Sequence, residues 1–177
     1  MASPTLSAAG LGTLFAQRVV VGVGDMAVSN NTNAILTTYA LGSCIGLIAF
    51  DPSTNAAGLL HYMLPDSTIS PDKAKTQPSM FADTGLPMLF RAFTGVKGDM
   101  KRAKYFVAGG ASVLNGTDPF KIGERNIQAL ETWFRANGLR PTIHDVGGTH
   151  NRTVSIEVKN GAIAMKTPTG TQQFSLA

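Results

Sequence analysis

The chain alternates short apolar runs with segments of turn-forming residues, and most of the runs have the length of β-strands. Several are rich in β-branched residues, and residues 153–158 strictly alternate polar with apolar positions. These patterns are typical of buried or half-buried strands, while Gly, Asn, Asp and Pro between them favour turns. Strands are therefore expected over residues 18–23, 34–39, 45–50, 58–63, 104–108, 140–146, 153–158 and 162–165.

Two longer segments repeat apolar residues every three or four positions, which is the spacing of one face of an α-helix. Helices are expected over residues 84–94 and 124–137, the first capped by Asp83 or Thr84. Residues 65–78, rich in Pro, Ser, Asp and Lys, are expected to form a long exposed loop. The inward faces of the two helices would carry Leu86, Leu89, Phe90, Phe93, Ile127, Leu130, Trp133 and Phe134.

The order of elements, mostly strands with two helices, predicts an α/β fold of the α+β kind. A chain of 177 residues with 44% apolar residues is large enough for one well-filled core. We expect a single domain over residues 18–166, preceded by a flexible extension at 1–17 and followed by a flexible polar tail at 167–177.

Charge and composition narrow the classes of function. The net charge is +4, but the basic residues are scattered, and the densest group, within residues 97–104, lies in a polar connection. A solvated loop explains this group better than nucleic-acid binding, and a basic face that meets an acidic protein partner is the alternative. A single thiol with isolated histidines lacks the ligand spacing of a zinc site, so neither a metal nor a cofactor is expected.

The cellular setting follows from what the pattern does not contain. One cysteine cannot form an internal disulfide, and no run of about 20 apolar residues is available to span a membrane. Residues 1–17 carry no Lys or Arg, so a signal peptide is not expected. These features predict a cytoplasmic protein.

The only cysteine, Cys44, follows Gly42 and Ser43 in a predicted turn. Free cysteine is often a buried core residue, which is one interpretation of this position. Small residues before the thiol instead leave backbone N–H groups free to approach a ligand, as an oxyanion site requires. The turn therefore favours a nucleophile at Cys44, with Gly42 and Ser43 beside the oxyanion.

A histidine partner for the thiol is offered by the next predicted hairpin. Two apolar runs flank the turn segment 51–55 and are expected to pair as antiparallel strands. If Phe50 faces Ala57 across this hairpin, His61 lies diagonal to Cys44 on the same face, roughly 7–8 Å away. A loop longer or shorter by one residue would place the two on opposite faces.

The residues alone leave the choice of histidine open. His144 in a predicted strand and His150 in a polar loop could also reach Cys44 in space. Thr38 ends the strand before the turn, where its hydroxyl could hold a histidine ring, although a β-branched residue in a strand needs no such role.

Five short strings then occur in order along the chain, within about Val19 to Lys166. They are Leu41-Gly42-Ser43-Cys44, His61-Tyr62-Met63-Leu64-Pro65-Asp66-Ser67, Phe81-Ala82-Asp83-Thr84, Gly123-Glu124-Arg125-Asn126 and Asp145-Val146-Gly147-Gly148. Each string is weak by itself. Their order and spacing together resemble CheD, the chemoreceptor glutamine deamidase family of bacterial and archaeal chemotaxis.

The resemblance implies that Cys44 is the nucleophile, that His61 is the base and that Thr38 completes a triad. It also implies a fold similar to that of cysteine deamidase toxins, with stacked mixed β-sheets flanked by helices. The implied partners are methyl-accepting chemoreceptors and, in many species, the phosphatase CheC.

The implied activity is hydrolysis of specific receptor glutamine amides to glutamate and ammonia through a thioester on the cysteine. A glutamate methyl ester offers the same carbonyl with a better leaving group, so receptor methylesterase activity is a second reaction that this chemistry allows. The alternatives are a non-catalytic adaptor that binds CheC or receptors, and a cysteine peptidase that uses the same nucleophile.

Overall fold

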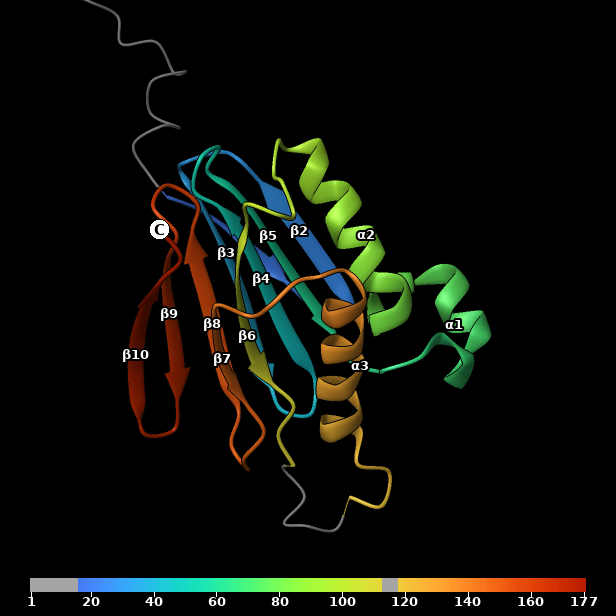
Figure 1. Ribbon diagram of the computed structural model, residues 1–177. Helices are drawn as coiled ribbons and strands as arrows, with labels where there is room; N and C mark the ends of the chain where they lie inside the picture. Colours follow the sequence, from blue (N-terminus) through green and yellow to red (C-terminus); the bar gives the residue numbers. More distant parts are fainter. Residues whose placement is uncertain (1–15, 113–117) are drawn as a thin grey trace, which may run out of the picture.

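Two five-stranded β-sheets lie face to face in the computed structural model, which describes residues 16–112 and 118–177 (Figure 1). Sheet A contains, in spatial order, β1 (Gln17–Val21), β3 (Ala34–Leu41), β8 (Arg152–Glu157), β9 (Ala162–Thr167) and β10 (Gly170–Ser175). Sheet B contains β2 (Asp25–Ser29), β5 (Ala56–Tyr62), β4 (Ile45–Asp51), β6 (Lys104–Gly109) and β7 (Ile143–Val146). Both sheets are mixed, because β1 with β3 and β6 with β7 are parallel while the other pairs are antiparallel.

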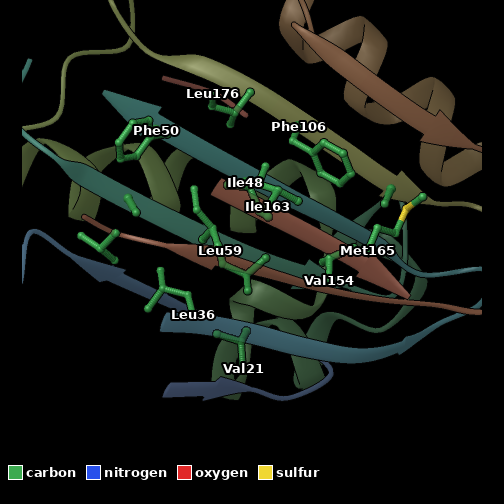
Figure 2. Packing of buried hydrophobic residues seen from close by; sticks show 14 of the residues in the cluster. Val21, Leu36, Ile48, Phe50, Leu59, Phe106, Val154, Ile163, Met165 and Leu176 are labelled. Carbon is green, nitrogen blue, oxygen red and sulfur yellow. The ribbon is translucent and has the colours of Figure 1, made fainter. Parts of the chain in front are cut away.

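The space between the sheets is filled by apolar side chains from both of them. Leu36 and Val154 come from sheet A, and Ile48, Leu59 and Phe106 come from sheet B (Figure 2). Alternate residues of a strand point to opposite faces, so the neighbours of these residues in sheet B point the other way.

The outer face of sheet B is covered by helices α2 (Ala82–Gly95) and α3 (Ile122–Ala136), as Figure 1 shows. Leu47 and Leu60 of the sheet pack there in one cluster with Leu86 of α2 and Phe134 of α3. Sheet B is thus buried on both faces, which is why every residue of β4 and β5 is buried. The result is three layers: sheet A, sheet B and the helices.

Most predicted elements are confirmed, with ends that differ by at most three residues, and the fold is of the α+β class. Strand β2 was not predicted. Its only apolar residues, Met26, Ala27 and Val28, form a run of three without alternation, which is too short to indicate a strand.

Residues 65–78 are exposed as predicted, but they are not a plain loop. They contain the 3-10 helix η2 (Ser67–Ile69) and helix α1 (Pro71–Thr76), neither of which has a buried residue. A second 3-10 helix, η3 (Pro78–Met80), follows. Local chemistry forms these turns, since the Asp66 side chain accepts from the Thr68 N–H and Pro71 begins α1, and such elements leave no apolar period to detect.

The predicted cap of α2 is wrong. The N-cap is Phe81 without a side-chain hydrogen bond, and α2 begins at Ala82. Asp83 instead accepts from the backbone N–H and the hydroxyl of Ser67, at 3.0 and 2.6 Å, while the Thr84 hydroxyl donates to the Pro78 carbonyl. Both side chains therefore fix the connection that leaves β5 rather than the helix end.

The prediction of a flexible tail at 167–177 is also wrong. Strand β10 pairs with β9 over its whole length, and Leu176 beyond it is fully buried. Backbone hydrogen bonds hold this edge strand whatever the polarity of its side chains. Because Gln172 and Gln173 are polar, the pattern of apolar residues did not indicate a strand here. Of the predicted extension at 1–17, residues 1–15 lie outside the described residues, and Gln17 already belongs to β1.

Candidate active site

The hairpin of β4 and β5 has the register that the sequence predicts. Phe50 pairs with Ala57, and Gly46 pairs with His61, so Cys44 stands diagonal to His61 just beyond the last pair of the ladder. Both residues lie on the side of sheet B that faces sheet A, as shown by the contact of Cys44 with the core cluster between the sheets.

His61 is held by a residue of the opposite sheet. The Nδ1 atom of His61 lies 2.7 Å from the Oγ1 atom of Thr38, and that hydroxyl also donates to the Val21 carbonyl at 2.7 Å. A hydroxyl has one proton, and that of Thr38 goes to the Val21 carbonyl. Thr38 must therefore accept the hydrogen bond from His61, so Nδ1 carries the imidazole proton. The Nε2 atom of His61 is therefore the unprotonated nitrogen, and no partner for it is present among the described residues.

The turn that carries Cys44 is fixed through its carbonyl groups. The Gly42 carbonyl accepts from the Ala111 N–H and the Cys44 carbonyl from the Gly110 N–H, each at 2.8 Å. The Ser43 carbonyl between them accepts from a side-chain amide of α3 at 2.9 Å. In a trans peptide the N–H points opposite to the preceding carbonyl, so the N–H groups of Ser43 and Cys44 point away from this scaffold.

Two glycines let the chain pack this closely around the turn. A Cβ atom on Gly109 would lie 2.0 Å from the Cys44 carbonyl oxygen, and the backbone there has φ +113°. A Cβ atom on Gly123 would lie 2.5 Å from the carbonyl oxygen of Gly110. Larger residues would push β6 and α3 away from the thiol.

Burial shifts the ionisation of both candidate reactive groups. It raises the pKa of the half-buried Cys44 thiol to about 11, an effect that the Cys44 backbone N–H partly offsets. It lowers the pKa of His61, which is fully buried, to about 4. Near pH 7 the free site therefore holds a neutral thiol and a neutral imidazole.

The lowered pKa of His61 predicts a stability profile. In the unfolded chain the histidine pKa is near 6.5, so the unfolded chain binds a proton at His61 more readily than the folded chain does. The contribution of neutral His61 to the free energy of unfolding is therefore complete above pH 6.5 and is lost as the pH falls to 4. Wild-type unfolding free energy should fall by roughly 3 kcal/mol more than that of His61→Gln between pH 7 and pH 4. Urea denaturation at both pH values measures this difference, and parallel profiles would contradict it.

The other two histidines are placed differently. His144 is exposed on β7, and His150 lies in the loop before β8, where its carbonyl accepts from Arg152 at 3.3 Å. Of the three, His61 is the one that Thr38 holds on the face that carries Cys44. Within residues 16–112 and 118–177 no group of three or more His, Cys, Asp or Glu side chains is arranged to hold a metal ion.

Comparison with known proteins places the chain in a family. The family model described as "CheD chemotactic sensory transduction" matches residues 63–167. A protein of Syntrophus aciditrophicus named "Probable chemoreceptor glutamine deamidase CheD 1" is 47% identical over 86% of this chain and 95% of its own length. The chain belongs to the CheD family. A CheD of Solibacter usitatus is 43% identical over 83% of this chain and 87% of its own, and one of Pyrococcus horikoshii is 33% identical over 85% and 92%.

The five strings that resemble CheD meet around the hairpin end in this CheD-family chain. The Met80 carbonyl accepts from the N–H groups of Met63 and Leu64, and Ser67 bonds to Asp83, which joins the second string to the third. Gly109 and Gly110, which the sequence did not single out as site residues, support the Cys44 turn.

No helix in the described part of the chain is both long and apolar enough to cross a membrane.

Sequence reasoning named Asn126 only within the fourth string and gave it no role in the site. Its side-chain amide donates to the carbonyls of Ser43 and Met63, at 2.9 and 2.8 Å. The signal available in the sequence was a polar residue one position before Ile127, on the helix face predicted to be apolar. A polar side chain on an inward face requires internal hydrogen bonds.

Proposed function

We propose that this CheD-family chain is a chemoreceptor glutamine deamidase that works through a thioester on Cys44. The observation that carries the proposal is the bond between Thr38 and His61, which leaves Nε2 of His61 as a base on the face that carries the only thiol of the chain. The names of its relatives supply the substrate, a glutamine side chain of a chemoreceptor.

The reaction begins from the neutral pair. Nε2 of His61 takes the thiol proton as Sγ of Cys44 attacks the side-chain carbonyl carbon of the glutamine. The protonated imidazole then donates to the leaving nitrogen, which departs as ammonia and leaves a thioester. A water molecule, deprotonated by the same imidazole, attacks the thioester and releases glutamate and the free thiol. The net change is one amide and one water converted to one carboxylate and ammonia.

The oxyanion of each tetrahedral intermediate needs donors near Sγ. Gly42 and Ser43 are the residues that the sequence predicts, and the carbonyl bonds of the turn favour the N–H groups of Ser43 and Cys44 as the donors. In this arrangement Gly42 has no side chain to block the oxyanion, and its carbonyl is held by the Ala111 N–H.

Thr38 acts in this scheme as a positioning residue for the ring. In Thr38→Val, which keeps the shape of the side chain, Nδ1–H of His61 loses its acceptor, and kcat/KM for deamidation should fall roughly 10–100-fold. Thr38→Ser keeps the hydroxyl and should stay within a few-fold of wild type. Ammonia release measures both, and an equal loss in the two variants would show that the hydroxyl is not what the reaction needs.

The experiment that tests the function uses the full chain and the cytoplasmic fragment of a chemoreceptor from the same organism. Deamidation adds about 1 Da at a glutamine and releases one ammonia, which peptide mass spectrometry and an ammonia assay detect together. A cleaved receptor chain would instead indicate a cysteine peptidase. Receptor binding without conversion would indicate the non-catalytic adaptor.

Three finer predictions belong to the same proposal. The thioester chemistry also accepts a glutamate methyl ester, whose methanol leaves more readily than ammonia, so receptor methylesterase activity is its second reaction. Partnership with CheC is a prediction from the resemblance, and a cytoplasmic location is a prediction from the sequence pattern.

A further inference from the structure

Asn126 of α3 bridges the two chain segments that present Cys44 and His61. Its Nδ2 group donates to the carbonyl of Ser43, the residue before the thiol, and to the carbonyl of Met63, two residues after the histidine. Figure 1 shows the first turns of α3 beside the turn between β3 and β4. The side chain of Asn126 is fully buried.

The bridge closes the open end of the hairpin. The pairing of β4 with β5 ends at Ile45 and Tyr62, so the next position, Cys44 opposite Met63, is not paired in the sheet. Because both acceptors are carbonyls, the two protons of Nδ2 fix the orientation of the amide. A single planar group thus sets the separation of the two segments where the ladder no longer does.

This placement leaves one polar atom without a partner. Oδ1 of Asn126 is buried and accepts no hydrogen bond from the described residues. An unpaired buried acceptor is unfavourable and offsets part of the gain from the two bonds that Nδ2 makes. Both hydrogen bonds of this side chain go to the segments that carry Cys44 and His61, so its clear effect is on the geometry of the site.

We infer that Asn126 is a positioning residue that spaces the segment bearing Cys44 from the segment bearing His61, so that the thiol can reach the free Nε2 in the reacting complex. The inference deepens the proposed deamidase and rests on it for the reaction, but not for the geometry. Small displacements of reacting groups cost large factors in rate, about 100-fold for 1 Å. The amide thus acts on the reaction through the two residues it spaces.

The test compares Asn126→Ala, its volume-keeping counterpart Asn126→Leu, His61→Gln and wild type. The first measurement is the rate of alkylation of Cys44 by iodoacetamide from pH 5 to 10, which needs no receptor and reports on a single thiol. Wild type should react at least about 10-fold faster at pH 7 than His61→Gln, because the imidazole assists the thiol. Both Asn126 variants should react at the His61→Gln rate across this pH range.

The second measurement is deamidation of the receptor fragment, in which kcat should fall roughly 100-fold in both Asn126 variants while KM changes less than about threefold. Tyr62→Phe is the matched control. It removes the bond from the Tyr62 hydroxyl to the backbone carbonyl of Asn126, at 2.7 Å, and leaves the side-chain bridge intact. This control should alkylate and turn over within about twofold of wild type.

Several results would overturn the inference. It fails if the folded Asn126 variants alkylate like wild type, if wild type does not exceed His61→Gln, or if Tyr62→Phe shows the same loss, since the effect is then one of general packing. A wild type that converts no receptor glutamine but shows the alkylation difference would refute the deamidase and leave the positioning role standing.

Discussion

Cys44→Ala is expected to lose deamidation by at least about 10³-fold while remaining folded. The chain has no second thiol that could replace the nucleophile, so the residual rate is that of an oxyanion site acting on water. Cys44 is half-buried at the end of a turn that is fixed by backbone carbonyls, so removing its sulfur should cost little stability. Conversion of receptor glutamine, measured by peptide mass spectrometry, tests the rate, and thermal unfolding tests the fold.

The single cysteine also makes the intermediate accessible. Acid quenching of wild type during turnover should trap receptor peptide on Cys44 alone, and the adduct should be absent from Cys44→Ala. A matched control is Gln173→Ala on the exposed edge strand β10, three strands from Thr38 in sheet A, which should be as active as wild type. Activity that survives in Cys44→Ala would exclude the thioester mechanism.

His61→Gln should lower kcat/KM by roughly 10²- to 10⁴-fold, the range that general acid–base catalysis supplies. The larger consequence is for pH dependence. Burial lowers the pKa of His61 to about 4, and the base must be neutral, so wild-type kcat/KM should stay level from pH 7 down to about 5 and reach half its value near pH 4. A solvent-exposed histidine would place that midpoint near 6.5.

The measurement is kcat/KM at intervals between pH 4 and 8, with the receptor fragment checked by circular dichroism at each pH. A midpoint near 6.5, or a His61→Gln variant with wild-type rate, would contradict the assignment and transfer the role of base to His144 or His150. The alkylation profile gives an independent check. With a Cys44 pKa of about 11, which burial sets, neither wild type nor His61→Gln should show a thiolate plateau below pH 10, so the faster alkylation of wild type at pH 7 reports on the imidazole.

Much of the arrangement could be predicted because it depends on neighbours in the chain. The turn residues between β4 and β5 fix the loop length, the loop length fixes the register, and the register places His61 diagonal to Cys44. The helical spacing of apolar residues in α2 and α3 could be recognised for the same reason, because it depends only on which residues lie on one face of one helix.

The remainder could not be predicted, because nothing local encodes it. The tail forms β10 by backbone pairing with β9, which polar side chains such as Gln172 neither require nor prevent. Asn126 sits in an ordinary helix, and its importance comes from the two carbonyls that packing brings to it. Thr38 was expected to hold a histidine ring, but only packing fixes its contact with Nδ1 of His61.

The sequence by itself therefore determined the class of fold, the hairpin, the family resemblance and the identity of the candidate nucleophile. Only the tertiary structure decided how the histidine is held, which of its nitrogens is free and what spaces it from the thiol. The physical reason is that these are contacts between layers. Thr38 reaches His61 from sheet A, and Asn126 reaches the Cys44 turn from the helices, so both bonds exist only once the layers have packed.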